Sequence, residues 1–136
     1  MNLKKGFEIQ HAIDNLNWKY KNLKFSSNKS NVTSSSFQNS TEYRLLKLAE
    51  IQKQIDNLQF ELAKVIRNLE NFIENSTLDD KSKVILIRRY CYLETFDQIS
   101  KCLGFTQRHI YRLHRNALKV VSTMSVSSQL DIHKKM

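Results

Sequence analysis

The apolar residues between Thr41 and Asn75 recur at alternating three- and four-residue steps, and this spacing restricts the possible fold more than any other feature. The repeat consists of Leu48, Ile51, Ile55, Leu58, Leu62, Val65, Leu69 and Phe72. Heptad spacing places these side chains on one face of a helix and is typical of coiled coils. We therefore predict a long helix over residues 42–75 with an apolar seam that must be covered.

The apolar seam can be covered by another helix of the same chain or by a second subunit. At about 1.5 Å per residue the helix would be on the order of 50 Å long, more than one small domain can cover. A shorter amphipathic helix is expected over residues 1–25, where apolar residues again recur at helical spacing. Either this helix folds back as an antiparallel hairpin, or a second subunit covers the seam, or both. We expect both, with the seam as the contact of a homodimer.

The residues that usually interrupt helices are scarce in this chain. Proline is absent and glycine occurs twice in 136 residues, which predicts an all-α fold. Twelve of the sixteen residues in 26–41 are Ser, Asn or Thr, so we expect a flexible connection there. The helical periodicity stops after Val121, and residues 122–136 are predicted to form a disordered tail.

Residues 77–121 are predicted to form a three-helix domain with a helix-turn-helix. Phe96, Ile99 and Leu103 lie at helical spacing on a short helix. Gly104 follows, and a residue without Cβ tolerates the left-handed backbone of a tight turn. Thr106 is a suitable N-cap for the next helix. This domain is short for an independent core, so we expect it to pack on a neighbouring helix or subunit.

Positive charge is concentrated on this domain. Residues 79–121 contain nine Lys or Arg against four Asp or Glu, whereas residues 41–78 contain five against six. No acidic residue occurs between Gln98 and Val121. Charge segregated in this way favours a nucleic acid partner over simple solubility.

The second helix of the motif supplies the candidate contacts to double-stranded DNA. Side chains in its first two turns can reach base edges in a major groove, and the candidates are Gln107, Arg108 and Arg112. The candidates for contacts to phosphates are Arg88, Arg89, Lys101, Thr106, His109, Tyr111, Arg115 and Lys119.

The motif resembles that of known transcription proteins. Thr95-x-x-x-Ile99, a turn, and then Thr106-x-x-x-Ile110 followed by Ala117-Leu118 is similar to region 4 of primary sigma factors, which reads the upstream promoter element. The whole chain more closely resembles the short phage proteins of the RinA/ArpU type, which regulate phage late transcription. Their sigma-like domain ends in an R-L-H-x-x-A-L sequence, which 112–118 match.

The resemblance covers about residues 12–121 and implies an N-terminal helix, a Ser-rich connection, a long helix and a sigma-like domain, in that order. The chain departs from typical sigma factors at one position. Gln107-Arg108 replaces the usual Arg-Glu order at the start of the recognition helix. We therefore expect its preferred bases to differ from those of a host promoter element.

Other kinds of chemistry find little support in the sequence. Cys91 and Cys102 are eleven residues apart, and His109 and His114 are five apart, whereas metal sites use closer pairs. Two isolated glycines cannot build a phosphate-binding loop, and no nucleophile has an oriented base beside it. We expect no enzyme activity, no metal and no cofactor. Two cysteines are too few for a disulfide scaffold and no apolar run suggests a membrane segment, which favours a reducing cytoplasm. The resemblance implies that this is the cytoplasm of a bacterial host.

The sequence thus predicts a sequence-specific DNA-binding regulator of phage type, an activator of late genes that acts as a homodimer. Two alternatives stay open. The first is a DNA-packaging component similar to a phage small terminase subunit, although those usually carry the motif at the N-terminus. The second is a sigma-like module that binds RNA polymerase or another protein, with an incidental basic face.

Overall fold

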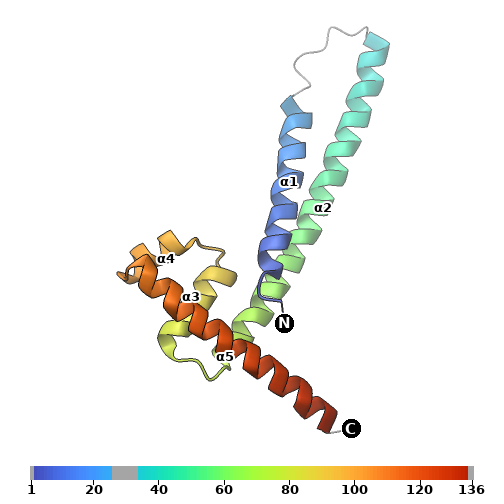
Figure 1. The fold of residues 1–136 in the computed structure, drawn as a ribbon. Coiled ribbons are helices and arrows are strands. Elements are labelled where there is room, and N and C mark those ends of the chain that lie inside the picture. Colours follow the sequence, from blue (N-terminus) through green and yellow to red (C-terminus); the bar gives the residue numbers. More distant parts are fainter. Residues whose placement is uncertain (1, 26–33, 135–136) are drawn as a thin grey trace. The chain divides into compact units, whose positions relative to one another are not determined.

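A computed structural model describes residues 2–25 and 34–134, with side chains described for residues 2–24 and 40–124. The described residues contain no strand, and they form five helices, which are α1 (Lys5–Phe25), α2 (Ser34–Glu74), α3 (Asp80–Tyr90), α4 (Phe96–Leu103) and α5 (Gln107–Lys134) (Figure 1). The all-α prediction is therefore confirmed. The helices form two compact units. One unit is Glu8–Ala63, and the other joins the residues before Glu8 to those from Lys64 onward.

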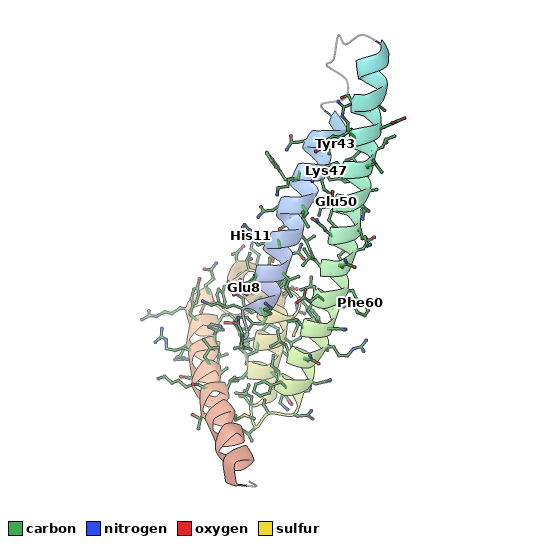
Figure 2. The ribbon with its side chains drawn as sticks, turned by 90° about the vertical axis from the view of Figure 1, so that its right-hand side faces the viewer. Glu8, His11, Tyr43, Lys47, Glu50 and Phe60 are labelled. Atoms are coloured by element: carbon green, nitrogen blue, oxygen red, sulfur yellow. The ribbon has the colours of Figure 1, made fainter. Side chains whose placement is uncertain are left out.

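In the unit formed by Glu8–Ala63, α1 lies beside α2 (Figures 1 and 2). Ile9 and Ile13 of α1 are 5% and 3% exposed, and Ile51 and Ile55 of α2 are 6% and 3% exposed. Residues four apart lie on the same face of a helix, so each helix presents one apolar stripe. Both stripes are buried in a single copy of the chain, and the two helices therefore cover each other.

This burial corrects the predicted dimer contact at three of the eight seam residues. Ile51, Ile55 and Leu69 are buried within one chain, so they are not available to a second subunit. The remaining seam residues are partly buried, and they are Leu48, Leu58, Leu62, Val65 and Phe72. The spacing indicated correctly that this face is covered, but a heptad does not say whether the cover comes from the same chain.

The start of α2 also differs from the prediction. Within the expected connection over 26–41, residues 26–33 lie outside the described part of the chain, and the helix already begins at Ser34. Ser, Asn and Thr lower helix stability by only a few tenths of a kcal/mol each. A long helix propagates through such residues once it is nucleated, because each further residue adds a hydrogen bond.

The second unit has a core at the junction of α3, α4 and α5. Ile85, Ile99 and Ile110, one from each helix, are fully buried in contact with one another. Partly buried apolar side chains surround them, namely Phe96, Leu103, Phe105 and Leu113. This arrangement holds α4 and α5 in a fixed relation to each other.

A second apolar cluster joins the last turns of α2 to the same unit. Leu69 and Ile73 of α2 pack with Leu86 and Tyr90 of α3 and with Ala117 of α5. The compact unit that contains the predicted domain 77–121 is larger than that domain, because it begins at Lys64 and includes the residues before Glu8. Three short helices bury too little apolar area alone, which is why the end of α2 completes their core.

The last helix is longer than the sequence indicated. α5 continues past Val121 to Lys134, where a disordered tail was predicted. No Pro or Gly occurs after Gly104, so no residue ends the helix at Val121. The loss of apolar spacing after Val121 therefore marks where packing ends, and the helix itself goes on.

Candidate nucleic-acid interface

The turn between α4 and α5 is fixed by local hydrogen bonds. Gly104 has a φ of 73° and ends α4, with its N–H donating to the carbonyl of Ser100 at 3.0 Å. The hydroxyl of Ser100 donates to the carbonyl of Phe105 across the same turn. Thr106 then accepts the N–H of His109 on its hydroxyl at 3.2 Å, which is the N-cap that the sequence predicted.

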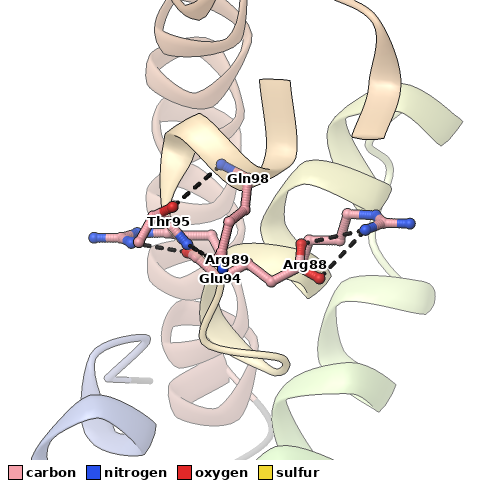
Figure 3. A network of polar contacts seen from close by, with 5 residues as sticks. All are labelled: Arg88, Arg89, Glu94, Thr95 and Gln98. Carbon is pink, nitrogen blue, oxygen red and sulfur yellow. Dashed lines mark hydrogen bonds and ion pairs between the residues drawn. The ribbon is translucent and has the colours of Figure 1, made fainter. Parts of the chain in front are cut away.

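The start of α4 is fixed equally firmly. The Thr95 hydroxyl accepts the backbone N–H of Gln98 at 3.1 Å, and the Gln98 side chain accepts the N–H of Thr95 at 2.8 Å (Figure 3). This reciprocal capping box satisfies two of the N–H groups that a helix leaves free at its start. Both ends of the short helix are thus defined by side chains encoded within the motif.

The outward face of α5 carries a continuous row of cations. Arg108, Arg112, Arg115 and Lys119 follow one another at steps of four, three and four residues, and all four are exposed. This cationic stripe is about 16 Å long, at about 1.5 Å per residue. The opposite face of the helix carries Ile110, Ala117 and Val121, which are buried. The stripe therefore points away from the core.

His109 and Tyr111 border the cationic stripe on either side of Arg108 and Arg112. His109 packs edge-on against Phe105, with ring centroids 4.9 Å apart, and Tyr111 packs against Phe96 at 4.8 Å. Both therefore cover apolar surface while part of each ring stays accessible. Together with Thr106 and the three arginines, they line an open concavity on this surface.

The guanidinium of Arg112 is held in place by His109. Its Nη2 lies 2.8 Å from Nδ1 of His109. Arginine can only donate, so Nδ1 must accept and the imidazole must carry its proton on Nε2. His109 thus acts on the surface by orienting Arg112, a role that the sequence did not reveal.

Gln107 is oriented by a contact across the turn. Its amide Nε2 donates to Asp97 of α4 at 2.9 Å, and Asp97 also pairs with Lys101 at 3.1 Å. The hydrogen bond from Lys101 lowers the pKa of Asp97, as do the charge of Lys101 and the Gln107 bond. All three side chains are exposed, so the contacts are worth little in stability. The contacts occupy one N–H donor of the Gln107 amide and pair the ammonium of Lys101 with a carboxylate.

Arg88 and Arg89 do not occupy the exposed positions that the sequence predicted. Leu93 adopts a left-handed φ of 58°, and the turn that it forms brings Glu94 back to both arginines. Arg88 forms a half-buried ion pair with Glu94 at 3.2 Å, and Arg89 donates to the Glu94 carbonyl at 2.9 Å (Figure 3). The hydrogen bond to Glu94 raises the pKa of Arg88.

The guanidinium of Arg89 is also enclosed by two aromatic rings. It lies 4.7 Å from the ring centroid of Phe7 and 4.4 Å from that of Phe96. Cations are attracted to the faces of aromatic rings, most strongly where water is excluded. The assignment of Arg88 and Arg89 to phosphate contacts is therefore corrected. Both arginines join the α3–α4 turn to its surroundings, and the sequence alone showed only that they were basic.

The two cysteines have opposite environments. Cys91 is buried, and burial raises the pKa of its thiol to about 11, with a smaller contribution from the charge of Glu70. Cys102 is exposed. Among residues 2–25 and 34–134, no three His, Cys, Asp or Glu side chains are grouped to hold a metal ion. No helix in that part of the chain has an apolar stretch long enough to cross a bilayer.

No family model, no curated protein and no solved structure matches the chain.

Proposed function

We propose that the chain binds double-stranded DNA through the outward face of α5. The observation that carries the proposal is the cationic stripe formed by Arg108, Arg112, Arg115 and Lys119 on a face without any acidic side chain. Basic residues that neutralise phosphates release counterions, which gives DNA binding its main electrostatic driving force. A major groove about 12 Å wide admits a single α-helix.

Within this surface we assign different roles to the two ends of the stripe. Arg108 and Arg112 lie in the first two turns of α5, from which side chains reach base edges in helix-turn-helix proteins. An arginine fork on guanine O6 and N7 is the commonest specific contact in the major groove. Arg115 and Lys119 lie further along the helix and bind phosphates, as Thr106 and Tyr111 do from its edges. Gln107 reads a base with the part of its amide that Asp97 leaves free.

The wider role follows from the resemblance to the RinA/ArpU type of phage protein. The chain is a sequence-specific regulator of transcription that activates late genes in the cytoplasm of a bacterial host. It acts as a homodimer, so that two α5 helices contact two half-sites on one face of the duplex. RNA polymerase is a further partner in this role.

The experiment that tests the proposal is a titration of labelled random duplex with the full-length chain, followed by sequencing of the genomic fragments that it retains. Binding at low salt and enrichment of a common sequence are the expected results. Arg115 and Lys119 of two subunits make four cationic phosphate contacts, which imply a loss of affinity of about 100-fold between 50 and 200 mM salt. Absence of binding at low salt would favour a protein-interaction module, and a ring of eight or more subunits in light scattering would favour a packaging role.

A further inference from the structure

The face of α2 opposite to Ile51 and Ile55 is exposed and has a heptad spacing of its own. Residues nine apart on a helix are separated by about half a turn, so Phe60 points away from Ile51. Phe60 is 65% exposed, and Figure 2 draws it on the side of α2 away from α1. Exposed residues at alternating steps of three and four continue this face on both sides of Phe60. We define the back face of α2 as Leu46, Ala49, Lys53, Asp56, Phe60 and Ala63.

Lys53 and Asp56 make the centre of this back face complementary to itself. They lie at equal distances on either side of a point between Gln54 and Ile55. If a second copy lies antiparallel with its centre at the same point, each Lys53 faces the partner subunit's Asp56. The side chain of Asp56 accepts a hydrogen bond from Gln52 on its own helix, and a carboxylate has room for a further donor.

The apolar residues of the back face are complementary in size. Ala49 and Phe60 are also equally distant from the centre, and so are Leu46 and Ala63. In the antiparallel arrangement each Phe60 therefore faces the partner subunit's Ala49, and each Leu46 faces the partner subunit's Ala63. A large side chain opposite a small one allows two helices to interdigitate without a void. Leu46 is 72% exposed in the single chain, so this cover removes apolar surface from water.

The parallel arrangement has none of these matches. There each Lys53 would face the partner subunit's Lys53, and each Asp56 the partner subunit's Asp56. Like charges at core positions of a helix pair oppose association and set its orientation. Phe60 would also meet its own copy while Ala49 and Ala63 left gaps. The pattern of charge and size therefore selects one orientation.

We propose that two copies of the chain associate through the back face of α2, as an antiparallel helix pair centred between Gln54 and Ile55. The stripe containing Ile51 and Ile55 stays in contact with α1, and the back face takes the role that the sequence assigned to the seam. This inference rests on the proposed function for the use of two DNA-binding surfaces. The association itself is measured without DNA, so each proposal can fail alone.

The first test is multi-angle light scattering of the full-length chain over a range of concentrations, with helix content followed by circular dichroism. The wild type should be a dimer. Lys53→Glu places acidic residues against the partner subunit's Asp56 and should raise the dissociation constant about tenfold or more. The double variant Lys53→Glu/Asp56→Lys exchanges the charges and should restore the dimer. Lys47→Glu reverses an exposed charge of α2 off the back face and should leave the dimer intact.

A monomeric wild type at 100 µM, or a Lys53→Glu variant with unchanged dissociation constant, would overturn the proposal. The double variant guards against a trivial explanation, because a helix that Glu at position 53 merely unfolds would not be rescued by a second charge reversal. A monomeric Lys53→Glu variant that still binds a single half-site at low salt would support the proposed DNA contact of α5. A dimer that binds no duplex would support association through the back face and would contradict the proposed function.

Cross-linking with a short bis-maleimide tests the orientation, in a Cys102→Ser background that removes the exposed thiol. The variant Leu46→Cys/Ala63→Cys should cross-link between copies, because the two positions meet in the antiparallel pair. They are about 26 Å apart along one helix, too far for a link within a chain. Ala63→Cys alone should not cross-link. The reverse outcome, with the single cysteine linking two copies, would show a parallel pair and overturn the proposal.

Discussion

The hydroxyl of Tyr90 and Nε2 of His114 lie 2.7 Å apart, and their rings are stacked with centroids separated by 5.7 Å. The contact joins α3 to α5 on the inward side of the helix that carries the cationic stripe. His114 also meets the edge of Phe96 at 4.9 Å. This imidazole is therefore part of the packing that holds α5 in place, and it has no direct part in the proposed contact with DNA.

Stability should fall as the solution becomes acidic, because His114 is held neutral. Burial lowers its pKa, and the positive charge of Arg89 lowers it further. The unfolded chain then binds a proton that the folded chain resists, so protonation favours unfolding. The free energy of unfolding should be highest above about pH 6.5, the ordinary histidine pKa, and should decrease as the pH falls below it. Urea titrations between pH 5 and 8 measure this dependence.

The matched variants for this prediction are His114→Gln and His11→Gln. His114→Gln should flatten the dependence of stability on pH in this window, at some cost in stability at neutral pH. His11 is exposed on α1, so its replacement should leave the dependence unchanged. Equal slopes for the wild type and His114→Gln would contradict the account of this residue.

Gly104→Ala should destabilise the chain by about 1 kcal/mol through backbone conformation alone. A Cβ at this position would meet nothing within 4 Å, so no steric clash contributes. The cost comes from the left-handed φ of 73°, which residues with a Cβ disfavour. Gly104→Asn should cost less, because asparagine tolerates this region better. Chemical denaturation of the two variants checks the order, and a larger loss for Asn than for Ala would be inconsistent with the turn described above.

Ile99→Ala should cost about 2–5 kcal/mol, the range for truncation of a fully buried aliphatic side chain. Ile99 is completely buried between Ile85 and Ile110, and its removal leaves a cavity at the junction of three helices. Val84 of α3 is 38% exposed, and Val84→Ala is the control that should change stability much less. Thermal and urea unfolding would measure both, and similar losses would argue against this core.

Arg112→Ala should weaken binding to the preferred DNA sequence by about 1–3 kcal/mol while affecting random duplex less. The reason is that a guanidinium oriented by His109 supplies two donors in the plane of a base edge. Lys47 is an exposed lysine of α2 off the back face, and Lys47→Ala serves as the control that should leave binding unchanged. Equal losses on specific and random duplexes would assign Arg112 to the phosphates.

The sequence contained most of the information for the helix-turn-helix. Gly104 and Thr106 predicted the turn and the cap, because each residue type has a local physical reason to occupy its position. The helical spacing of Phe96, Ile99 and Leu103 predicted which face of α4 is buried. The cationic stripe was visible as a helical spacing of basic residues, although its exposure was settled only by the packing of α5.

The errors arise where a partner comes from elsewhere in the chain. Arg88 and Arg89 looked like free cations in the sequence. The ion pair of Arg88 with Glu94 depends on the left-handed backbone at Leu93, and no sequence motif predicts that conformation. Likewise, spacing showed that Ile51 and Leu69 are covered, but their cover is set by tertiary packing. The bond from Gln107 to Asp97 crosses a turn and has no signature in helical spacing.

The salt dependence of duplex binding tests the central claim most directly, because it counts the phosphates that the protein neutralises. The logarithm of the binding constant should fall linearly with the logarithm of salt concentration, with a slope of about −0.9 for each phosphate contact. Arg115→Ala should reduce the magnitude of this slope by about 1 per chain bound, and Lys47→Ala should leave it unchanged. Identical slopes for the wild type and Arg115→Ala, or no measurable binding at low salt, would contradict the assignment of α5 to DNA.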